Sequence, residues 1–422
     1  MEQKIYNEYV EILKEELLPA MGCTEPIAVA YAAAVAVQAL GEKPESVEVN
    51  VSANIIKNVK SVVVPCTGGL RGIGAAVCAG IVAGCPEKEL EILEEITGEQ
   101  KVEMKKMLDT MPMTIRESDK EYIFDIQIKA CAGGHSGYVE IAGFHTNVIC
   151  VKKDDGIIRE KAYEEQGSSC ATDRSLLTVE KIIEFADCVD VADVEEVLQR
   201  QIDYNWAIAE EGMTGNWGAA IGKTLMEAYG NSVHNRAKAM AAAGSDARMN
   251  GCELPVVINS GSGNQGITTS LPVIVYAKEL NVSKEMMLRA LVVSNLITIH
   301  MKTGIGRLSA YCGAISAGCG AGAGICYLYG GRAYEISHVI VNAVAINSGV
   351  VCDGAKASCA AKIASAVEAG LLGLQMQKNG KQFYGGDGLV EKGVENTIRN
   401  IGELAKKGMR ETDKTIIQIM TR

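Results

Sequence analysis

Hydrophobic and polar positions along this chain follow two different periods, and the change of period divides the chain into segments. Residues 1–18 carry apolar side chains at helical spacing, and residues 27–40 are apolar on every face, which indicates a buried second helix. Between them the run MGCTEP breaks the first helix. Thr24 can cap the second helix there, and Pro26 is tolerated in its first turn.

From residue 46 to about residue 160 the pattern changes to the alternation that is typical of β-strands. SVEVNVSANI and SVVVP are predicted as strands, GGLRGIGAAVCAGIVAG as a helix of small residues, and charged helical segments continue to about Asp109. Short turns separate the four β-rich runs that follow, which favours an antiparallel meander. These runs are MTIRES, YIFDIQIKA, GYVEIAG and HTNVICVKK.

After about Leu176 the pattern is helical almost to the end of the chain. We therefore expect an α+β fold, in which residues 1–45 and 176–422 form a mainly helical domain. Residues 46–175 would form an inserted α/β domain with a largely antiparallel sheet. Within this insert, residues 161–175 are the expected linker or mobile loop.

Composition restricts the class of protein further. The 422 residues are 48% apolar and 22% charged, which excludes a disordered chain, and the net charge of −11 disfavours nucleic acid and anionic membranes as partners. Residues 308–331 and 339–352 carry little charge, but they are rich in Gly, Ala, Ser and Asn, and the mean hydropathy is only +0.10. Buried helices are therefore favoured over membrane spans. The first residues do not resemble a signal peptide, which predicts a cytoplasmic protein.

Fourteen cysteines in a reducing compartment do not indicate a disulfide framework. Cys312, Cys319 and Cys326 recur every seven residues, and Cys352 and Cys359 repeat that interval. Residues seven apart on one helix face the same way but lie about 10 Å apart along its axis, too far for both thiolates to hold one compact cluster. Cys319 and Cys326 are therefore predicted to be core residues of a small-residue helix.

The second pair differs because a turn and a helix start lie between its two cysteines. Asp353-Gly354 favours a turn and Ser358 can cap a helix, so the segment can fold back and place Cys359 at a helix N-terminus, which favours a thiolate. Together with Cys312, this pair would make a three-cysteine iron–sulfur site with one iron left free. Buried structural thiols are the alternative that the spacing leaves open.

A glycine-rich run, SGSGNQG at residues 260–266, follows the apolar run LPVVIN. Its glycines satisfy the G-x-G-x-x-G pattern, but Pro272 arrives too soon to leave room for the helix of a dinucleotide-binding unit. Three interpretations stay open. The run could cradle pyridoxal phosphate, with Lys57 as the only suggestive Schiff-base lysine, or hold a small carboxylate with its N–H groups, or form a turn for close packing.

Cys23 lies just before the second predicted helix, with Glu25 nearby. A helix N-terminus would lower the pKa of its thiol and make it a candidate base or nucleophile, and a buried structural thiol is the alternative. His300 lies upstream of Cys312 and close to Lys302 in sequence, and is a further candidate.

These motifs in combination resemble the L-cysteine desulfidases, which are relatives of the iron–sulfur L-serine dehydratase alpha chain. The resemblance extends over nearly the whole chain. The 40-residue step from Cys312 to Cys352 and the seven-residue step to Cys359 match the three cluster ligands of that family. The motifs that carry the resemblance are MGCTEP, SANIIKN, SGSGNQGITTSLP, the isolated Cys312 and CDGAKASC.

The resemblance implies a [4Fe–4S] cluster that is held by Cys312, Cys352 and Cys359 and has one iron without a cysteine ligand. It implies a non-redox lyase in the helical domain that converts L-cysteine and water to pyruvate, ammonia and hydrogen sulfide. Cys23 is the expected base for the α-proton. The expected substrate-binding residues are Thr24, Glu25, Asn54, Lys57, Asn58, Ser260, Gly261, Asn264, Gln265 and His300.

Three other functions have to be weighed. An L-serine dehydratase would use the same cluster chemistry, and a pyridoxal-phosphate enzyme could carry out the same net elimination. An iron–sulfur sensor or scaffold without turnover is disfavoured, because no basic patch or second interaction domain is evident. The expected partner is a small amino acid rather than nucleic acid or a membrane, and the small-residue helix surfaces are compatible with a homodimer.

Overall fold

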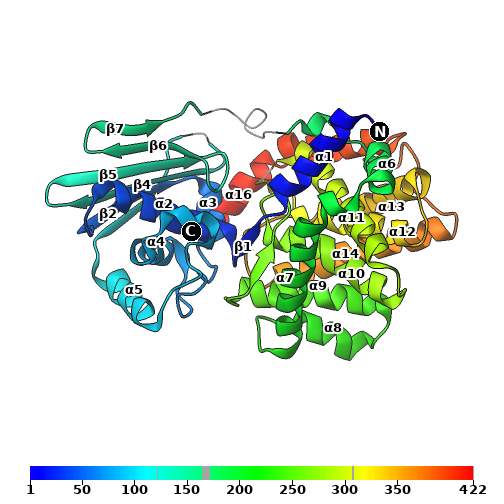
Figure 1. Ribbon diagram of the computed structural model, residues 1–422, viewed down its shortest axis with the longest axis horizontal. Coiled ribbons are helices and arrows are strands. Elements are labelled where there is room, and N and C mark those ends of the chain that lie inside the picture. The colour runs from blue at the N-terminus through cyan, green and yellow to red at the C-terminus, as the bar shows by residue number, and fades with distance from the viewer. Residues whose placement is uncertain (121, 164–171, 307, 422) are drawn as a thin grey trace.

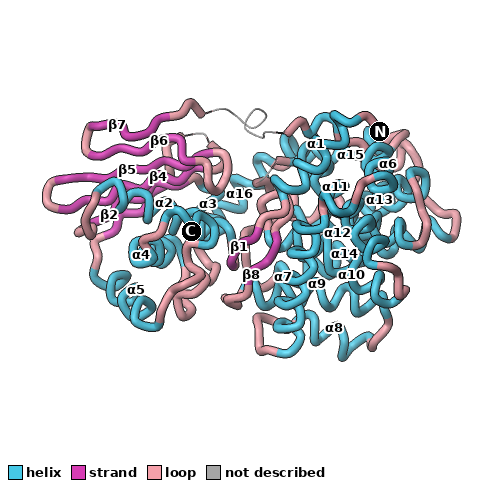
Figure 2. Tube along the Cα trace, viewed as in Figure 1, coloured by secondary structure: helices cyan, strands magenta, loops and turns pink. Residues whose placement is uncertain are grey.

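The computed structural model describes residues 1–120, 122–163, 172–306 and 308–421 as two packed bodies that lie side by side (Figure 1). One body is a six-stranded sheet with helices against it, and the other is a larger body of helices. Figure 2 shows the strands gathered almost entirely in the first body. The expected α+β fold with a largely antiparallel sheet is confirmed. Residues 164–171 of the expected linker lie outside the described residues.

The six strands follow the order β3-β2-β4-β5-β6-β7. β4 to β7 form an antiparallel meander, so the expected meander is confirmed for its last three runs and gains a further strand. The first run, β3, instead pairs in parallel with β2 at the edge, because the helices between them supply the crossover that a parallel pair requires. The strands are β2 (Ser46–Val51), β3 (Met113–Glu117), β4 (Asp125–Ala132), β5 (His135–Ala142), β6 (Val148–Lys153) and β7 (Gly156–Glu160).

The helices α2 (Thr24–Leu40) and α4 (Gly72–Ala83) pack against each other and share one hydrophobic core with the sheet. The apolar character of α2 on every face fits this position between a sheet and another helix. Residues up to Ala20 belong to the core of the helical body, whereas Met21 and the side chains of α2 belong to the core of the sheet. The expected domain boundary at residue 45 therefore moves to between Ala20 and Met21.

Of two segments that were predicted to be strands, SVEVNVSANI is a strand only as far as Val51, and SVVVP is not one. After β2 the chain turns into the helix α3 (Ala53–Val59), and the hydroxyl of Ser52 donates a hydrogen bond to the Ile123 carbonyl at 2.9 Å at this turn. SVVVP forms a loop with a single bridge between Val63 and Arg71. Its three consecutive valines are all buried, which is incompatible with the alternation of a strand with one exposed face. The other helices of this body are η1 (Pro86–Glu91) and α5 (Gly98–Thr110).

The helix α12 (Gly313–Leu328) runs through the middle of the helical body and packs against α10, α11, α13 and α14. Its residues from Ala314 to Tyr327 are buried, and most of them are Gly, Ala, Ser or Cys, so neighbouring helix axes can approach closely. Its main neighbours are α10 (Gly263–Glu279), α11 (Lys284–Ile305), α13 (Ala333–Asn347) and α14 (Cys359–Lys378). The rest of the body is α1 (Gln3–Glu16), η2 (Arg174–Leu176), α6 (Val179–Cys188), η3 (Val191–Asp193), α7 (Glu195–Thr214), α8 (Ile221–Tyr229), α9 (Val233–Met249), α15 (Val394–Glu403) and η4 (Leu404–Gly408).

Two further features connect the bodies. The strands β1 (Pro19–Met21) and β8 (Pro255–Val257) form a small antiparallel sheet, and the C-terminal helix α16 (Arg410–Thr421) lies against α3 of the other body (Figure 1). At that contact Lys57 of α3 forms a buried ion pair with Asp413 of α16. Among the helices of the described residues, none combines the length and the apolar character that crossing a lipid bilayer requires.

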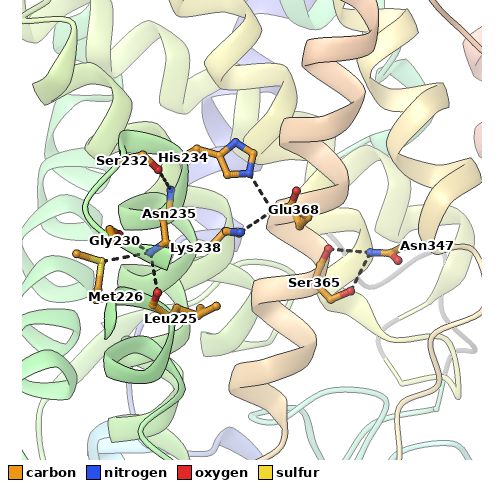
Figure 3. A network of polar contacts seen from close by, with 10 residues as sticks. All are labelled: Leu225, Met226, Gly230, Ser232, His234, Asn235, Lys238, Asn347, Ser365 and Glu368. Atoms are coloured by element: carbon orange, nitrogen blue, oxygen red, sulfur yellow. Dashed lines mark hydrogen bonds and ion pairs between the residues drawn. The ribbon is translucent and has the colours of Figure 1, made fainter. Parts of the chain in front are cut away.

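A polar network between the first turns of α9 and the middle of α14 holds these two helices together (Figure 3). The Glu368 carboxylate of α14 accepts hydrogen bonds from His234 at 2.9 Å and from the Lys238 ammonium at 2.6 Å, both on α9. On the other side of α14, Asn347 of α13 donates to the Ser365 carbonyl at 2.9 Å. The network therefore fixes the mutual position of α9 and α14.

Replacing Glu368 with Gln should destabilise this contact in a pH-dependent way. The hydrogen bond from His234 lowers the pKa of Glu368 from its ordinary 4.5 to about 2, against the effect of burial. A carboxylate with a lowered folded-state pKa stabilises the fold above its unfolded pKa and loses that contribution as the pH falls from 4.5 towards 2. Because Glu368 is partly exposed, we expect Glu368→Gln to lower the free energy of unfolding by about 1 kcal/mol at neutral pH.

Urea unfolding at neutral and acidic pH measures the difference in the free energy of unfolding between the parent protein and Glu368→Gln. Glu11→Gln, in the exposed ion pair with Lys14, is the matched control and should change the free energy of unfolding by less than about 0.5 kcal/mol. Equal losses in the two variants, or a Glu368→Gln loss that persists below the folded-state pKa, would show that the network does not stabilise the fold in this way.

Candidate active site

A cavity of about 110 Å³ lies where the helical body meets the α/β body. The starts of four helices line it: α2 through Cys23, α10 through Ser262, α12 through Cys312 and α14 through Cys359. The N-terminus of a helix has unpaired N–H groups and a positive dipole end. These helix ends therefore favour anions in the cavity, in opposition to the cost of burying a charge.

The structure brings Cys312, Cys352 and Cys359 together at this cavity. The backbone N–H of Cys312 donates to the Val350 carbonyl at 3.1 Å, and that of Cys352 donates to the Ala310 carbonyl at 2.6 Å. This antiparallel bridge places two cysteines that are 40 residues apart in the sequence side by side. Cys312 is buried, and the other two are partly buried.

The turn expected at Asp353-Gly354 is what returns the chain from Cys352 to Cys359. Gly354 has a φ of +92°, and a Cβ at this position would lie 2.4 Å from the carbonyl oxygen of Lys57, so the turn requires glycine. Ser358 precedes the first residue of α14, as expected for a cap position, although its side chain makes no capping hydrogen bond. The turn thus packs the loop of the helical body directly onto α3 of the α/β body.

Burial dominates the electrostatics of these thiols. It raises the pKa of Cys312, and the electrostatic interaction with the neighbouring Cys352 raises it further. Burial also raises the pKa of Cys359, so the expectation that its helix N-terminus would favour a free thiolate is wrong. Lys362 supplies a nearby positive charge. Although burial opposes it, the hydrogen bond to Asp353 raises the pKa of Lys362, whose ammonium also donates to the Val351 carbonyl at 2.9 Å.

The other two cysteines of the seven-residue series remain in the core. Cys319 and Cys326 lie within α12, are 1% and 2% exposed, and do not line the cavity. Within the described ranges, no three His, Cys, Asp or Glu side chains converge closely enough to hold a single metal ion. Ligands of an iron–sulfur cluster bind different iron atoms, so their sulfur atoms do not have to converge on one point.

Cys23, rather than Thr24, occupies the cap position of α2. Its thiol donates a hydrogen bond to Oε2 of Glu25 at 3.1 Å, and the Thr24 hydroxyl donates to the Gly261 carbonyl at 3.2 Å. Burial and the Glu25 charge raise the pKa of Cys23 well above its ordinary value, although the Arg248 charge opposes them. The expected lowering of this pKa by the helix end is therefore wrong, because complete burial outweighs the helix dipole.

The glycine-rich run forms the strained start of α10. Ser260 has a φ of +51°, a left-handed conformation that costs a non-glycine residue about 1 kcal/mol or more. Pro272 does not end the helix as expected, because α10 continues through it to Glu279 and is buried along most of its length, so packing outweighs the cost of the proline. A dinucleotide-binding unit is excluded on another ground, since β8 before the run pairs only with β1, in an antiparallel sheet of two strands.

The expected substrate-binding residues divide into three groups. The first lines the cavity, the second lies beside it, and the third lies elsewhere. The lining group is Glu25, Lys57, Asn58, Ser260, Gly261, Asn264 and Gln265. Asn54 lines a wider adjoining cleft of about 1120 Å³ between the two bodies, and Thr24 is held against Gly261. His300 is placed wrongly by the sequence analysis, because it pairs with Glu395 of α15 at 2.7 Å and does not line the cavity.

Sequence reasoning missed five charged or titratable residues of the lining, namely His145, Arg248, Lys302, Tyr311 and Lys362. Arg248 had a detectable signal, because it and Asp246 are the charged residues of the otherwise small and mostly apolar run AMAAAGSDARM. A charge in such a buried helix indicates a specific partner. His145 had no comparable signal, since its position depends on the loop between β5 and β6, where its ring packs edge-on against Phe124.

Comparison with known proteins assigns this fold and site to a class. Residues 87–418 match the family model described as serine dehydratase alpha chain, so the chain belongs to that family and is an iron–sulfur amino-acid lyase. The family resemblance that the motifs indicated is thereby confirmed.

Curated relatives match over almost their full length. The chain is 59% identical to a UPF0597 protein of Desulfitobacterium hafniense, over 99% of this chain and 97% of the relative. It is 50% identical to a UPF0597 protein of Lachnoclostridium phytofermentans, over 99% of this chain and all of the relative. It is 43% identical to one of Treponema denticola, over all of this chain and 99% of the relative.

Proposed function

We propose that this protein catalyses β-elimination from L-cysteine, which with one water molecule yields pyruvate, ammonia and hydrogen sulfide. The observation that carries the proposal is the meeting of Cys312, Cys352 and Cys359 at one cavity with the glycine-rich start of α10. The family supports an iron–sulfur amino-acid lyase. The choice of L-cysteine rests on the motif resemblance to the L-cysteine desulfidases.

The three thiols fit an iron–sulfur cluster by the chemistry of their donors. Thiolate sulfur is the ligand that such clusters use, and the helix starts and the Lys362 ammonium offset the negative charge that three thiolates bring into a buried site. Cys312, Cys352 and Cys359 would hold a [4Fe–4S] cluster with one iron free of cysteine. When bound, this cluster would supply a Lewis acid that makes the β-substituent a better leaving group.

The start of α10 would bind the polar groups of the substrate. The N–H groups of this helix start, with Ser260, Gly261 and Asn264, suit the carboxylate. The side-chain oxygen of Gln265 is buried and has no hydrogen-bond partner among the described residues, so it can accept a hydrogen bond from the substrate amino group.

Cys23 is the proposed base for the α-proton. Its thiol proton already points to Glu25, so the carboxylate can take that proton and leave a thiolate to accept the proton from Cα. Lys57 and Asn58 close the cavity from the α/β side, where Lys57 is held by Asp413. This buried ion pair also disfavours the pyridoxal-phosphate alternative through Lys57, because it occupies the Schiff-base lysine that the sequence suggested.

An L-serine dehydratase is the second candidate, and the family model that matches the chain favours it. Anaerobic assays of pyruvate and sulfide with L-cysteine, L-serine and their D-forms distinguish the two. We expect kcat/KM for L-cysteine to exceed that for L-serine at least about tenfold, which corresponds to ~1.4 kcal/mol of transition-state binding. A preference for L-serine would establish the dehydratase instead, and no pyruvate from any of the four would contradict both lyase proposals.

The ligand assignment predicts which cysteines control iron binding. Cys312→Ala, Cys352→Ala and Cys359→Ala should each lower the iron content and the visible absorption of the anaerobically reconstituted protein, because each removes one thiolate ligand. Cys319→Ala is the matched control, since this residue packs within α12 and should keep its iron. A fully loaded Cys352→Ala protein, or iron loss in Cys319→Ala, would contradict the assignment.

The proposed role of Cys23 as a base predicts a loss of turnover without a loss of iron. Cys23→Ala should keep its iron but lose at least about 100-fold in kcat, the contribution that a general base typically makes. Iron content and kcat are measured on the same preparation. Near-normal turnover in this variant would exclude Cys23 as the base.

A further inference from the structure

A buried arginine faces the cavity without an acidic partner. Arg248, near the end of α9, is 3% exposed and lines the cavity. One of its terminal nitrogens donates to Oδ1 of Asn264 at 3.2 Å, whereas its Nε is buried without a hydrogen-bond partner. Within the part of the chain that the structure describes, no Asp or Glu forms an ion pair with it.

The acidic side chains closest to Arg248 in sequence or around the cavity have other partners. Asp246, on the same helix, accepts a hydrogen bond from the Gly222 N–H at the start of α8. Glu25 accepts hydrogen bonds from the Cys23 thiol and the Thr24 hydroxyl. A guanidinium stays charged at all ordinary pH values, and a buried charge is costly unless an anion compensates it. Among the described residues neither carboxylate forms an ion pair with Arg248, so an anionic ligand could compensate the guanidinium charge.

The packing around Arg248 directs its unpaired edge to the start of α10. A Cβ on Gly263, the first residue of α10, would lie 2.3 Å from Nε, so only glycine lets the guanidinium approach so closely. The positive end of α10 and the guanidinium then act on the same region of the cavity. Two positive groups with unpaired donors are suited to a carboxylate, which can accept two parallel hydrogen bonds from an arginine.

We propose that Arg248 binds the α-carboxylate of the amino-acid substrate through its guanidinium, and that it makes a free carboxylate a requirement for binding. The inference rests on the proposed function, in that it takes the cavity to bind an amino acid. Arg248 on α9 would then determine substrate specificity together with the loop at the start of α10.

The test compares ligands that differ only in the carboxylate. Calorimetric titration of the iron-loaded protein with L-alanine and with L-alaninamide measures binding without turnover, and KM and kcat for L-cysteine are measured in parallel. In Arg248→Gln we expect L-alanine binding to weaken about 30-fold, as for the loss of a charge-assisted hydrogen bond. Binding of the amide should change less than about threefold, KM for L-cysteine should rise to a similar extent as the L-alanine dissociation constant, and kcat should fall much less.

Two further variants separate recognition from structure. Arg248→Lys keeps the charge and should recover part of the L-alanine affinity. Arg236→Gln removes another arginine of α9, which pairs with Glu279 far from the cavity, and should bind L-alanine like the parent. The iron content of every variant checks that the site has folded.

The outcomes decide the proposal independently of turnover. A parent protein that binds L-alanine but releases no pyruvate would overturn the proposed reaction, and the contrast between acid and amide would still decide the role of Arg248. Equal losses of acid and amide binding in Arg248→Gln would show a merely structural role. Unchanged L-alanine binding in that variant, or a parent that binds neither ligand, would overturn the inference.

Discussion

The convergence of four helix N-termini on one cavity is the constraint on which the rest of this structure depends. Each helix start adds unpaired N–H groups and a partial positive charge to a buried space, and anionic groups placed there are stabilised without any net basic character of the protein. The chain as a whole carries a net charge of −11, so the helix starts make the potential in the cavity locally positive in a protein that is negative overall. In the proposed function, the same helix starts would stabilise both the thiolate ligands of the cluster and the carboxylate of the substrate.

The cavity exists only because two bodies with separate cores meet. The α/β body supplies Cys23 at the start of α2 and Lys57 in α3, and the helical body supplies the three cysteines and Arg248. The junction is fixed by close contacts, among them Gly354 against the Lys57 carbonyl and the buried ion pair between Lys57 and Asp413. A site built from both bodies is sensitive to their mutual position.

The sequence was sufficient for the fold class and for the helical character of most of the chain, because these follow from local periodicity. Spacing alone left the three-cysteine site open, and the family resemblance of the motifs singled out the three cysteines that line the cavity. Sequence reasoning failed where tertiary packing outweighs local preference. Pro272 lies inside a helix because burial compensates its cost, and the Cys23 thiol has a raised pKa because burial outweighs the helix dipole. His300 was misplaced because a sequence does not show which face of a helix meets Glu395, and Arg248 was missed because its partners come from another helix.

The central claim is that three thiols hold a cluster in which one iron atom remains open to the substrate. Mössbauer spectroscopy of protein loaded anaerobically with iron-57, before and after addition of L-cysteine, tests this most directly. The account expects four iron atoms per chain, of which one changes its spectrum when the amino acid binds. A spectrum in which no iron atom responds to L-cysteine, or one of a cluster with four equivalent cysteine-ligated sites, would contradict it.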